Sequence, residues 1–251
     1  MTTSMTVDDV LVRTAPVRSW AHAPLPLLTS VDEVTLMRTS KRRDEHLTSR
    51  SLLSEALRQW GMTKSDLMSL EIRRDRHRAP YLAWIQGTFR RTDLPSISIG
   101  HGAGQAIVAV CGGDRWIGID SEPQDRSIDR AAFDLFARGD ELDILSDAPE
   151  RAMLHWVAKE AVQKAMRLGM HLDPRSIPFG ADLGVGRRSV KVQDVELTLI
   201  IAEDQGWWRA VAIRDRGDAP SDPESSVLED LRRRIESATS MGEVRIGCRP
   251  S

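Results

Sequence analysis

The apolar pattern of this chain changes from helical spacing to strand spacing twice, and this order limits the fold more than any other feature. A helical region at 40–61 is followed by β-rich runs at 96–99, 106–111 and 116–120, which predict an antiparallel meander. The second series comprises helical regions at 129–145 and 146–169 and β-rich runs at 189–193, 195–204 and 206–215. We therefore predict an α+β fold of two similar halves, each a small antiparallel sheet packed on helices.

Local signals place the ends of the helices. Ser40 predicts an N-cap and Gly61 a stop for the first helix. The second long helix is predicted from Ser146, with Pro149 near its first turn and Gly169 as its stop. Apolar spacing in the 227–235 segment further predicts one terminal amphipathic helix.

Composition narrows the classes of partner. Thirty-five basic and 37 acidic residues give a formal charge of -2, so no overall field favours nucleic acid or a membrane surface. Cys111 and Cys248 have no metal-ligand spacing and are too few for a disulfide framework. The first residues lack a signal-peptide pattern, and no apolar run approaches the ~20 residues needed to span a bilayer. We expect a soluble, cytoplasmic protein.

Two carboxylates end the strand predicted at 116–120. Asp120 and Glu122 lie two apart, so in a strand they point to the same face. Paired oxygen ligands suit Mg²⁺, which takes one or two protein carboxylates and completes its shell with water and phosphate oxygens. The pair by itself nevertheless favours the plainer interpretation of a solvated strand end.

A third acid lies on the helix predicted at 146–169. Glu160 and Lys164 fall at the edge of its apolar face, on the same side as Trp156. They fit an ordinary i,i+4 surface pair, worth ~0.3 to 0.5 kcal/mol. Their position beside the apolar stripe modestly favours the wall of a cleft.

Basic groups gather at three other places. Lys41, Arg42 and Arg43 occupy the first turn of a helix, where the positive end of the dipole disfavours them, so an anion is expected to compensate their charge. The glycines around His101 in "GHGAG" would let backbone N–H groups approach an anion, although a hairpin turn with a surface histidine is the simpler interpretation. Arg78 in "RHRAP" fits a solvated loop arginine better than a ligand.

Five ordered elements together are similar to a known family. Over residues 38–180, "KRRDEHLTSRSLLSEAL", "RAP", "SISIGHG", "GIDSE" and "WVAKEAVQKA" resemble the motifs of the surfactin-type 4'-phosphopantetheinyl transferases. Within that superfamily they are most similar to the branch of the enterobactin-synthase transferase component. The resemblance implies transfer of the 4'-phosphopantetheine arm of coenzyme A to a carrier-protein serine, with release of adenosine 3',5'-bisphosphate.

Roles for single residues follow from the resemblance. It implies that Asp120, Glu122 and Glu160 hold Mg²⁺ against the coenzyme A pyrophosphate, and that Glu160 accepts the serine proton directly or through water. Lys164 would stabilise phosphate charge, with Lys159 as a second cation in the same site.

Further residues would bind the rest of the coenzyme. Arg43, with Arg42 and Lys41, matches the basic residues for the 3'-phosphate of coenzyme A, and Arg78 and His101 would contribute from neighbouring loops.

The chain departs from the family pattern at three places. The usual S-H-S turn reads Gly100-His101-Gly102, Ser121 replaces Ile or Val between the acids, and the usual G-x-G-L reads Arg167-Leu168-Gly169-Met170. We expect Ser121 to point away from the carboxylates and to affect packing. The change at 167–170 falls near the expected carrier site.

The family fold implies two pseudo-symmetric halves, 1–123 and 124–251, with the active site between them. Expected partners are acyl, aryl or peptidyl carrier proteins of polyketide, nonribosomal peptide or fatty acid synthases, in secondary metabolism or siderophore synthesis, and a monomeric enzyme is expected. The alternative is a module that binds coenzyme A or a carrier protein but has lost efficient transfer.

Overall fold

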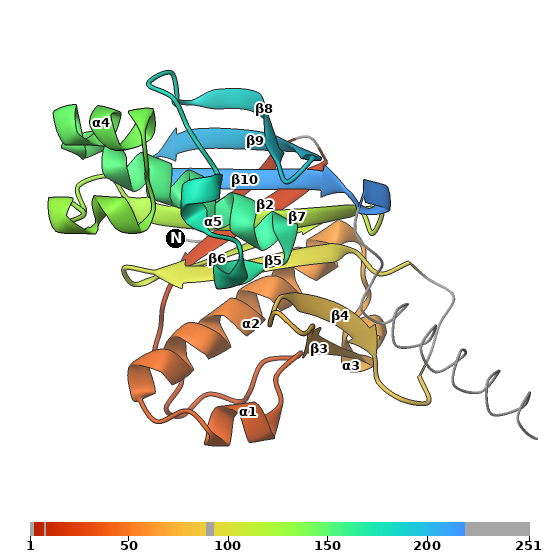
Figure 1. Ribbon diagram of the computed structural model, residues 1–251. Helices are drawn as coiled ribbons and strands as arrows, with labels where there is room; N and C mark the ends of the chain where they lie inside the picture. The colour runs from red at the N-terminus through yellow and green to blue at the C-terminus, as the bar shows by residue number, and fades with distance from the viewer. Residues whose placement is uncertain (1–2, 8, 89–92, 219–251) are drawn as a thin grey trace, which may run out of the picture. The chain divides into compact units, whose positions relative to one another are not determined.

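We describe the fold from a computed structural model of the chain, covering residues 3–7, 9–88 and 93–218 (Figure 1). The strands are β1 (Thr3–Val7), β2 (Val10–Pro16), β3 (Leu70–Arg74), β4 (Pro80–Trp84), β5 (Ser96–Gly102), β6 (Gln105–Cys111), β7 (Arg115–Pro123), β8 (Gly186–Val192), β9 (Val195–Asp204) and β10 (Trp207–Asp215). The α-helices are α1 (Val31–Thr35), α2 (Ser40–Trp60), α3 (Lys64–Met68), α4 (Asp140–Asp147) and α5 (Ala152–Met166). The 3-10 turns are η1 (Arg130–Leu135), η2 (Pro149–Arg151), η3 (Gly169–His171), η4 (Pro174–Ser176) and η5 (Arg216–Asp218). Within these ranges, no helix is long and apolar enough to cross a membrane.

Two four-stranded sheets form the framework. Their strand orders are β1-β2-β6-β5 and β7-β10-β9-β8, and β3 and β4 form a separate hairpin. Every paired strand is antiparallel to its neighbour. Helix α2 packs on β2 and β6, and α5 packs on β7 and β10. The predicted α+β class, with small antiparallel sheets packed on helices, is confirmed.

Successive side chains of a strand point to opposite faces of the sheet, and both faces of each sheet are buried. The α2 face of the first sheet includes Leu11 and Val108, and the α5 face of the second includes Leu199 and Ala212. The other faces meet in a third apolar layer that joins the sheets. This layer contains Val10, Val12, Ile107, Ala109, Cys111, Ile117, Ile119, Val211 and Ile213. The order of layers is therefore α2, first sheet, second sheet, α5.

Strand β7 belongs to the second sheet, so the predicted three-strand meander is wrong. Its partner is β10, in a register that runs from Trp207 opposite Pro123 to Asp215 opposite Arg115. This nine-residue ladder also directs Ile117 and Ile119 into the layer between the sheets. The division at 123 and 124 stays a prediction, but the strand pairing groups β7 with the later residues.

The helix ends differ slightly from the predicted ones. Thr39, not Ser40, caps α2 by accepting a hydrogen bond from the Arg42 N–H, while Gly61 ends it in the left-handed conformation as predicted. The helix predicted from 146 divides, because α4 ends at Asp147 and α5 begins only at Ala152. The predicted terminal helix at 227–235 lies outside the described residues.

Candidate active site

Helix α5 and strand β7 approach each other unusually closely at Gly118. A Cβ atom built there would lie 2.0 Å from the Ala161 carbonyl oxygen and 2.9 Å from the Lys164 Cβ. Only a residue without a side chain permits this approach. It brings the part of α5 that carries Glu160 and Lys164 against the end of β7 that carries Asp120.

Lys164 connects the two elements. Its ammonium donates hydrogen bonds to the Asp120 carboxylate at 2.6 Å and to the Ile119 carbonyl at 3.0 Å. It lies 3.9 Å from the Glu160 carboxylate, one helical turn away. The structure thus brings two of the predicted acids, Asp120 and Glu160, around the predicted cation Lys164.

Glu122 faces the same side of β7 but has a different partner. Its carboxylate accepts a hydrogen bond from the Arg126 guanidinium at 2.7 Å. A Cβ atom at Gly102 would lie 2.9 Å from a Glu122 carboxylate oxygen. The altered Gly-His-Gly turn of β5 therefore leaves the space that Glu122 occupies.

The four charged groups are electrostatically coupled. Burial chiefly raises the pKa of Glu160, and the Asp120 and Glu122 carboxylates raise it further against the opposing effect of Lys164. For Lys164, burial lowers the pKa, but the nearby Asp120 and Glu160 carboxylates outweigh it, so that the net shift is upward. A protonated lysine and a carboxylate with raised proton affinity are thus held side by side.

The donor chemistry of these acids fits Mg²⁺, although they are not gathered as a metal centre. Among the residues that the structure describes, no group of three or more His, Cys, Asp or Glu side chains lies close enough to hold an ion. Asp120 and Glu122 are instead each paired with a cation. Three coupled carboxylates from two elements nevertheless supply the oxygen ligands that Mg²⁺ prefers. A metal ion would have to compete with these two cations for the carboxylate oxygens.

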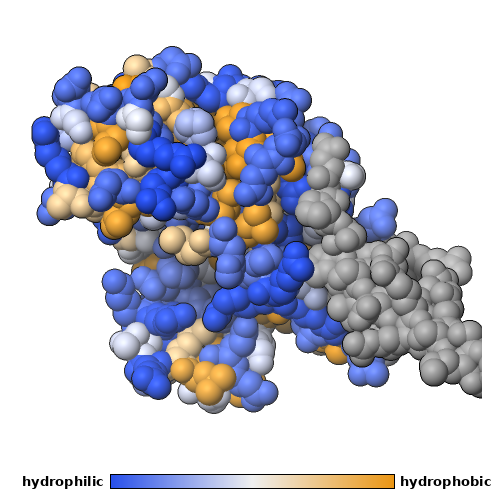
Figure 2. All heavy atoms as spheres, in the orientation of Figure 1, coloured by the Kyte–Doolittle hydropathy of each residue, from blue (hydrophilic) through white to orange (hydrophobic). Residues whose placement is uncertain are grey.

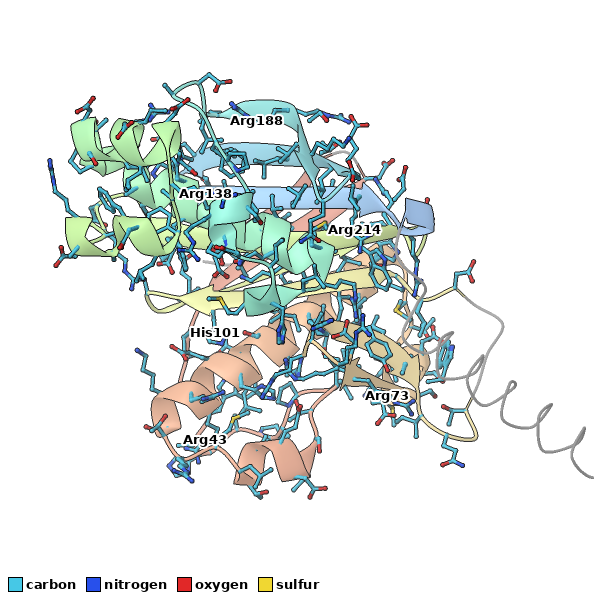
Figure 3. All side chains as sticks on the ribbon, viewed as in Figure 1. Arg43, Arg73, His101, Arg138, Arg188 and Arg214 are labelled. Atoms are coloured by element: carbon cyan, nitrogen blue, oxygen red, sulfur yellow. The ribbon has the colours of Figure 1, made fainter. Side chains whose placement is uncertain are left out.

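The basic turn lies at the start of α2, as predicted. Lys41 is exposed and lies 4.0 Å from Glu45, and Arg42 is also exposed. Arg43 is half-buried, and its Nε atom has no hydrogen-bond partner among the described residues. His101 lies 3.6 Å from Glu45, which brings the β5 turn to the same helix end (Figure 3).

Two basic residues beside Arg43 were missed by the sequence interpretation. His46 and Arg50 follow it at i+3 and i+7, the spacing of one helix face, which is the signal that could have found them. Arg50 is buried and lies 3.4 Å from Glu33. Burial chiefly, with Arg50 and other nearby cations, lowers the pKa of His46 to about 4. Arg43, His46 and Arg50 therefore place closely spaced basic side chains on one face of α2.

Arg78 occupies a turn that is attached to the far end of α5. It is exposed, with φ of 68°, and its N–H donates to the Asp75 carbonyl at 2.9 Å. Arg167 at the end of α5 lies 2.8 Å from the Asp75 carboxylate and hydrogen-bonds the carbonyls of Ala79 and Pro80. Arg167 of the altered 167–170 segment thus fixes the turn that carries Arg78.

Lys159 lies elsewhere, and the expectation that it adds a second cation to the acidic site is corrected. Its side chain is fully buried. Its ammonium donates to the Glu141 carboxylate at 2.8 Å, to the Pro174 carbonyl at 2.9 Å and to the Ile177 carbonyl. Since adjacent helix residues differ by ~100°, Lys159 faces the protein interior while Glu160 faces β7. It joins α4 and the η4 turn to α5.

A partly apolar pocket adjoins the acids. Its volume is about 430 Å³, and Glu122 and Arg126 lie on its wall with Phe136, Met153 and Trp156. Figure 2 shows apolar side chains among hydrophilic ones on this part of the surface, over the η1 and α4 region. Leu135 and Met170 at this pocket are the most exposed of its large apolar residues, 68% and 73%.

The charged side chains of this site are of a kind found in one class of enzyme. Coupled carboxylates, a fixed lysine and a basic helix end suit an enzyme that transfers a phosphorus-containing group.

Comparison with known families gives one match that agrees with this chemistry. Residues 117–198, about a third of the chain, match the family model described as the 4'-phosphopantetheinyl transferase superfamily. The matched segment contains Asp120, Glu122, Glu160 and Lys164. The match supports the superfamily predicted from the motifs, whose members are transferases that use coenzyme A and act on carrier proteins. No curated protein matches the chain.

Proposed function

We propose that this chain is a Mg²⁺-dependent transferase of the surfactin type, close to the enterobactin-synthase branch. It moves the 4'-phosphopantetheine moiety of coenzyme A to a serine of apo acyl or peptidyl carrier proteins. The observation that carries the proposal is the contact of α5 with β7 at Gly118, which places Glu160 and Lys164 beside Asp120 inside the segment that matches the superfamily.

The reaction forms one bond and breaks one. The serine oxygen of the carrier attacks the β-phosphorus of coenzyme A, a new P–O bond forms, and the P–O bond of the pyrophosphate bridge breaks. Adenosine 3',5'-bisphosphate leaves with that electron pair. Glu160 accepts the serine proton, directly or through water, a role that suits its raised pKa.

The other side chains bind charge. Lys164, held protonated by its carboxylate neighbours, stabilises the negative charge of the transferred phosphate. Asp120, Glu122 and Glu160 would hold Mg²⁺, which when bound neutralises the pyrophosphate. Arg43, with Arg42 and Lys41, binds the 3'-phosphate, and the unpartnered Arg43 Nε supports this role.

The partners and setting belong to the proposal. Carrier proteins of polyketide, nonribosomal peptide or fatty acid synthases receive the arm, in secondary metabolism or siderophore synthesis. The protein acts in the cytoplasm as a monomer.

The test incubates a panel of apo carrier proteins with coenzyme A, Mg²⁺ and the purified protein, and then weighs the carriers by mass spectrometry. We expect at least one carrier to gain the mass of a phosphopantetheine group, and no gain with Asp120→Ala or Glu160→Ala. If no carrier gains mass while the protein still binds coenzyme A in calorimetry, the binding-module alternative is correct.

A further inference from the structure

The turn after β7 brings a cation back over the acidic site. The Gln124 N–H donates to the Gly206 carbonyl at 2.9 Å, and the Arg126 N–H donates to the Pro123 carbonyl at 3.3 Å. These bonds fix the turn, so that Arg126 lies four residues beyond Glu122 with its guanidinium 2.7 Å from that carboxylate.

The two cations of the site are held very differently. Lys164 donates to both Asp120 and the Ile119 carbonyl, and its side chain is only 26% exposed. The Arg126 side chain is 56% exposed, and Glu122 is its ion-pair partner. An ion pair with one exposed partner contributes little to stability and exchanges readily. Arg126 can therefore leave its carboxylate far more easily than Lys164 can leave Asp120.

Glu122 itself has little freedom to move away from Arg126. It lies near the end of the β7 ladder, opposite Trp208, and Gly102 of β5 lies directly against its carboxylate. Its side chain is only 15% exposed. The Glu122 carboxylate is therefore held in place, whereas the cation that binds to it can exchange.

We propose that Arg126 is the resident counter-cation of Glu122, that a divalent cation must displace it, and that Arg126 thereby sets the metal affinity of the acidic site. This inference rests on the proposed function for the assignment of the metal. A guanidinium beside a carboxylate both competes for its oxygens and repels an incoming divalent ion. Arg126 and Glu122 both line the adjoining pocket, which gives the displaced guanidinium space beside the site.

Metal binding to the whole protein tests the inference without any turnover. Mn²⁺ is titrated into the coenzyme-free protein, and free Mn²⁺ is followed by electron paramagnetic resonance, with competition by Mg²⁺ as a check. We expect Arg126→Ala to lower the Mn²⁺ dissociation constant by roughly three- to tenfold, equivalent to ~0.7 to 1.4 kcal/mol. Arg126→Lys keeps the charge and should stay within about twofold of the natural protein.

Arg130→Ala is the matched control, since it removes an equal charge from an exposed position nearby. It should leave the Mn²⁺ affinity within about twofold, because no ion pair joins Arg130 to the acids among the described residues. Equal affinities for Arg126→Ala and the natural protein would overturn the role of Arg126 while leaving the metal assignment standing. Absence of Mn²⁺ binding in every variant would overturn both.

Discussion

The contact at Gly118 gives the sharpest test of how the fold builds the site. In Gly118→Ala, the new methyl group would lie 2.0 Å from the Ala161 carbonyl oxygen and 2.4 Å from the Ala165 amide nitrogen. Gly118 does not have positive φ, so the alanine backbone itself is unstrained. Any effect therefore comes from the separation of α5 and β7.

The required movement can be estimated from these contacts. Since Cβ contacts under 3.0 Å essentially do not occur, α5 must retreat by about 1 Å. Overpacking of a buried position typically costs ~1 to 3 kcal/mol, and a clash with backbone atoms belongs at the upper end, about 3 kcal/mol. The same movement would break the 2.6 Å bond between Lys164 and Asp120. Because misplacement by ~1 Å can cost ~100-fold in rate, we expect a loss of transfer of about that size.

Urea unfolding and carrier-protein transfer measure the two effects together. Gly184→Ala is the matched control, because its methyl group would meet only the Asp182 carbonyl at 3.9 Å. It should change the free energy of unfolding by less than ~0.5 kcal/mol. If Gly118→Ala unfolds at the same urea concentration as Gly184→Ala and transfers at the natural rate, the close contact is not what assembles the site.

Two further substitutions test the charges of the site. Arg43→Ala should weaken coenzyme A binding about tenfold in calorimetry, whereas 3'-dephospho-coenzyme A should bind the variant and the natural protein with equal affinity. The assignment of Arg43 to the 3'-phosphate would be refuted if both ligands lost the same affinity, or if Arg58→Ala weakened coenzyme A binding as much. Glu160→Gln should stabilise the protein at pH 8, because burial raises the pKa of Glu160 and the carboxylate therefore costs stability above that raised value. In urea unfolding this advantage should shrink as the pH falls toward about 4.5, the ordinary value; an advantage that grows at low pH would contradict the direction of the shift.

Features that depend on local periodicity could be predicted from the sequence. Asp120 and Glu122 share a face because a strand repeats every two residues, and Glu160 and Lys164 share one because they are a helical turn apart. The mutual approach of these two pairs was expected only from the family resemblance. Gly118, the glycine that permits this approach, is part of the "GIDSE" element, but the sequence alone assigned it no role.

Features that depend on long-range pairing could not be predicted in the same way. The run at 116–120 follows the one at 106–111 through a glycine-rich turn, which is typical of a hairpin. The ladder that β7 forms with β10 nevertheless involves residues far along the chain, and nothing local encodes it. The early strands β1 and β2 and the β3–β4 hairpin were missed for a related reason, since only pairing and tertiary packing make their short runs regular.

Lys159 shows why a motif alone does not place a side chain. It adjoins Glu160 in the resembling segment, and that adjacency suggested a shared site. One helical step turns it by ~100°, into the interior, where the Glu141 carboxylate and two backbone carbonyls hold its ammonium. Burial lowers the pKa of Lys159 while Glu141 acts in the opposite direction, as expected for a structural buried pair rather than a phosphate ligand.

The Gly-His-Gly turn and the acidic pair are best understood as one arrangement. A Cβ atom at Gly100 would lie 3.0 Å from the Ile107 side chain and 3.5 Å from the Lys164 ammonium, and one at Gly102 would press against Glu122. A serine at 102, as in the family pattern, would therefore require the Glu122 carboxylate to shift, whereas a serine at 100 would press on Ile107 and meet Lys164 only at an ordinary contact distance. The absence of a side chain at 102 lets Glu122 lie deep against β5, where Arg126 reaches it. The Gly-His-Gly departure thus bears directly on the position of Glu122 and on its contact with Arg126.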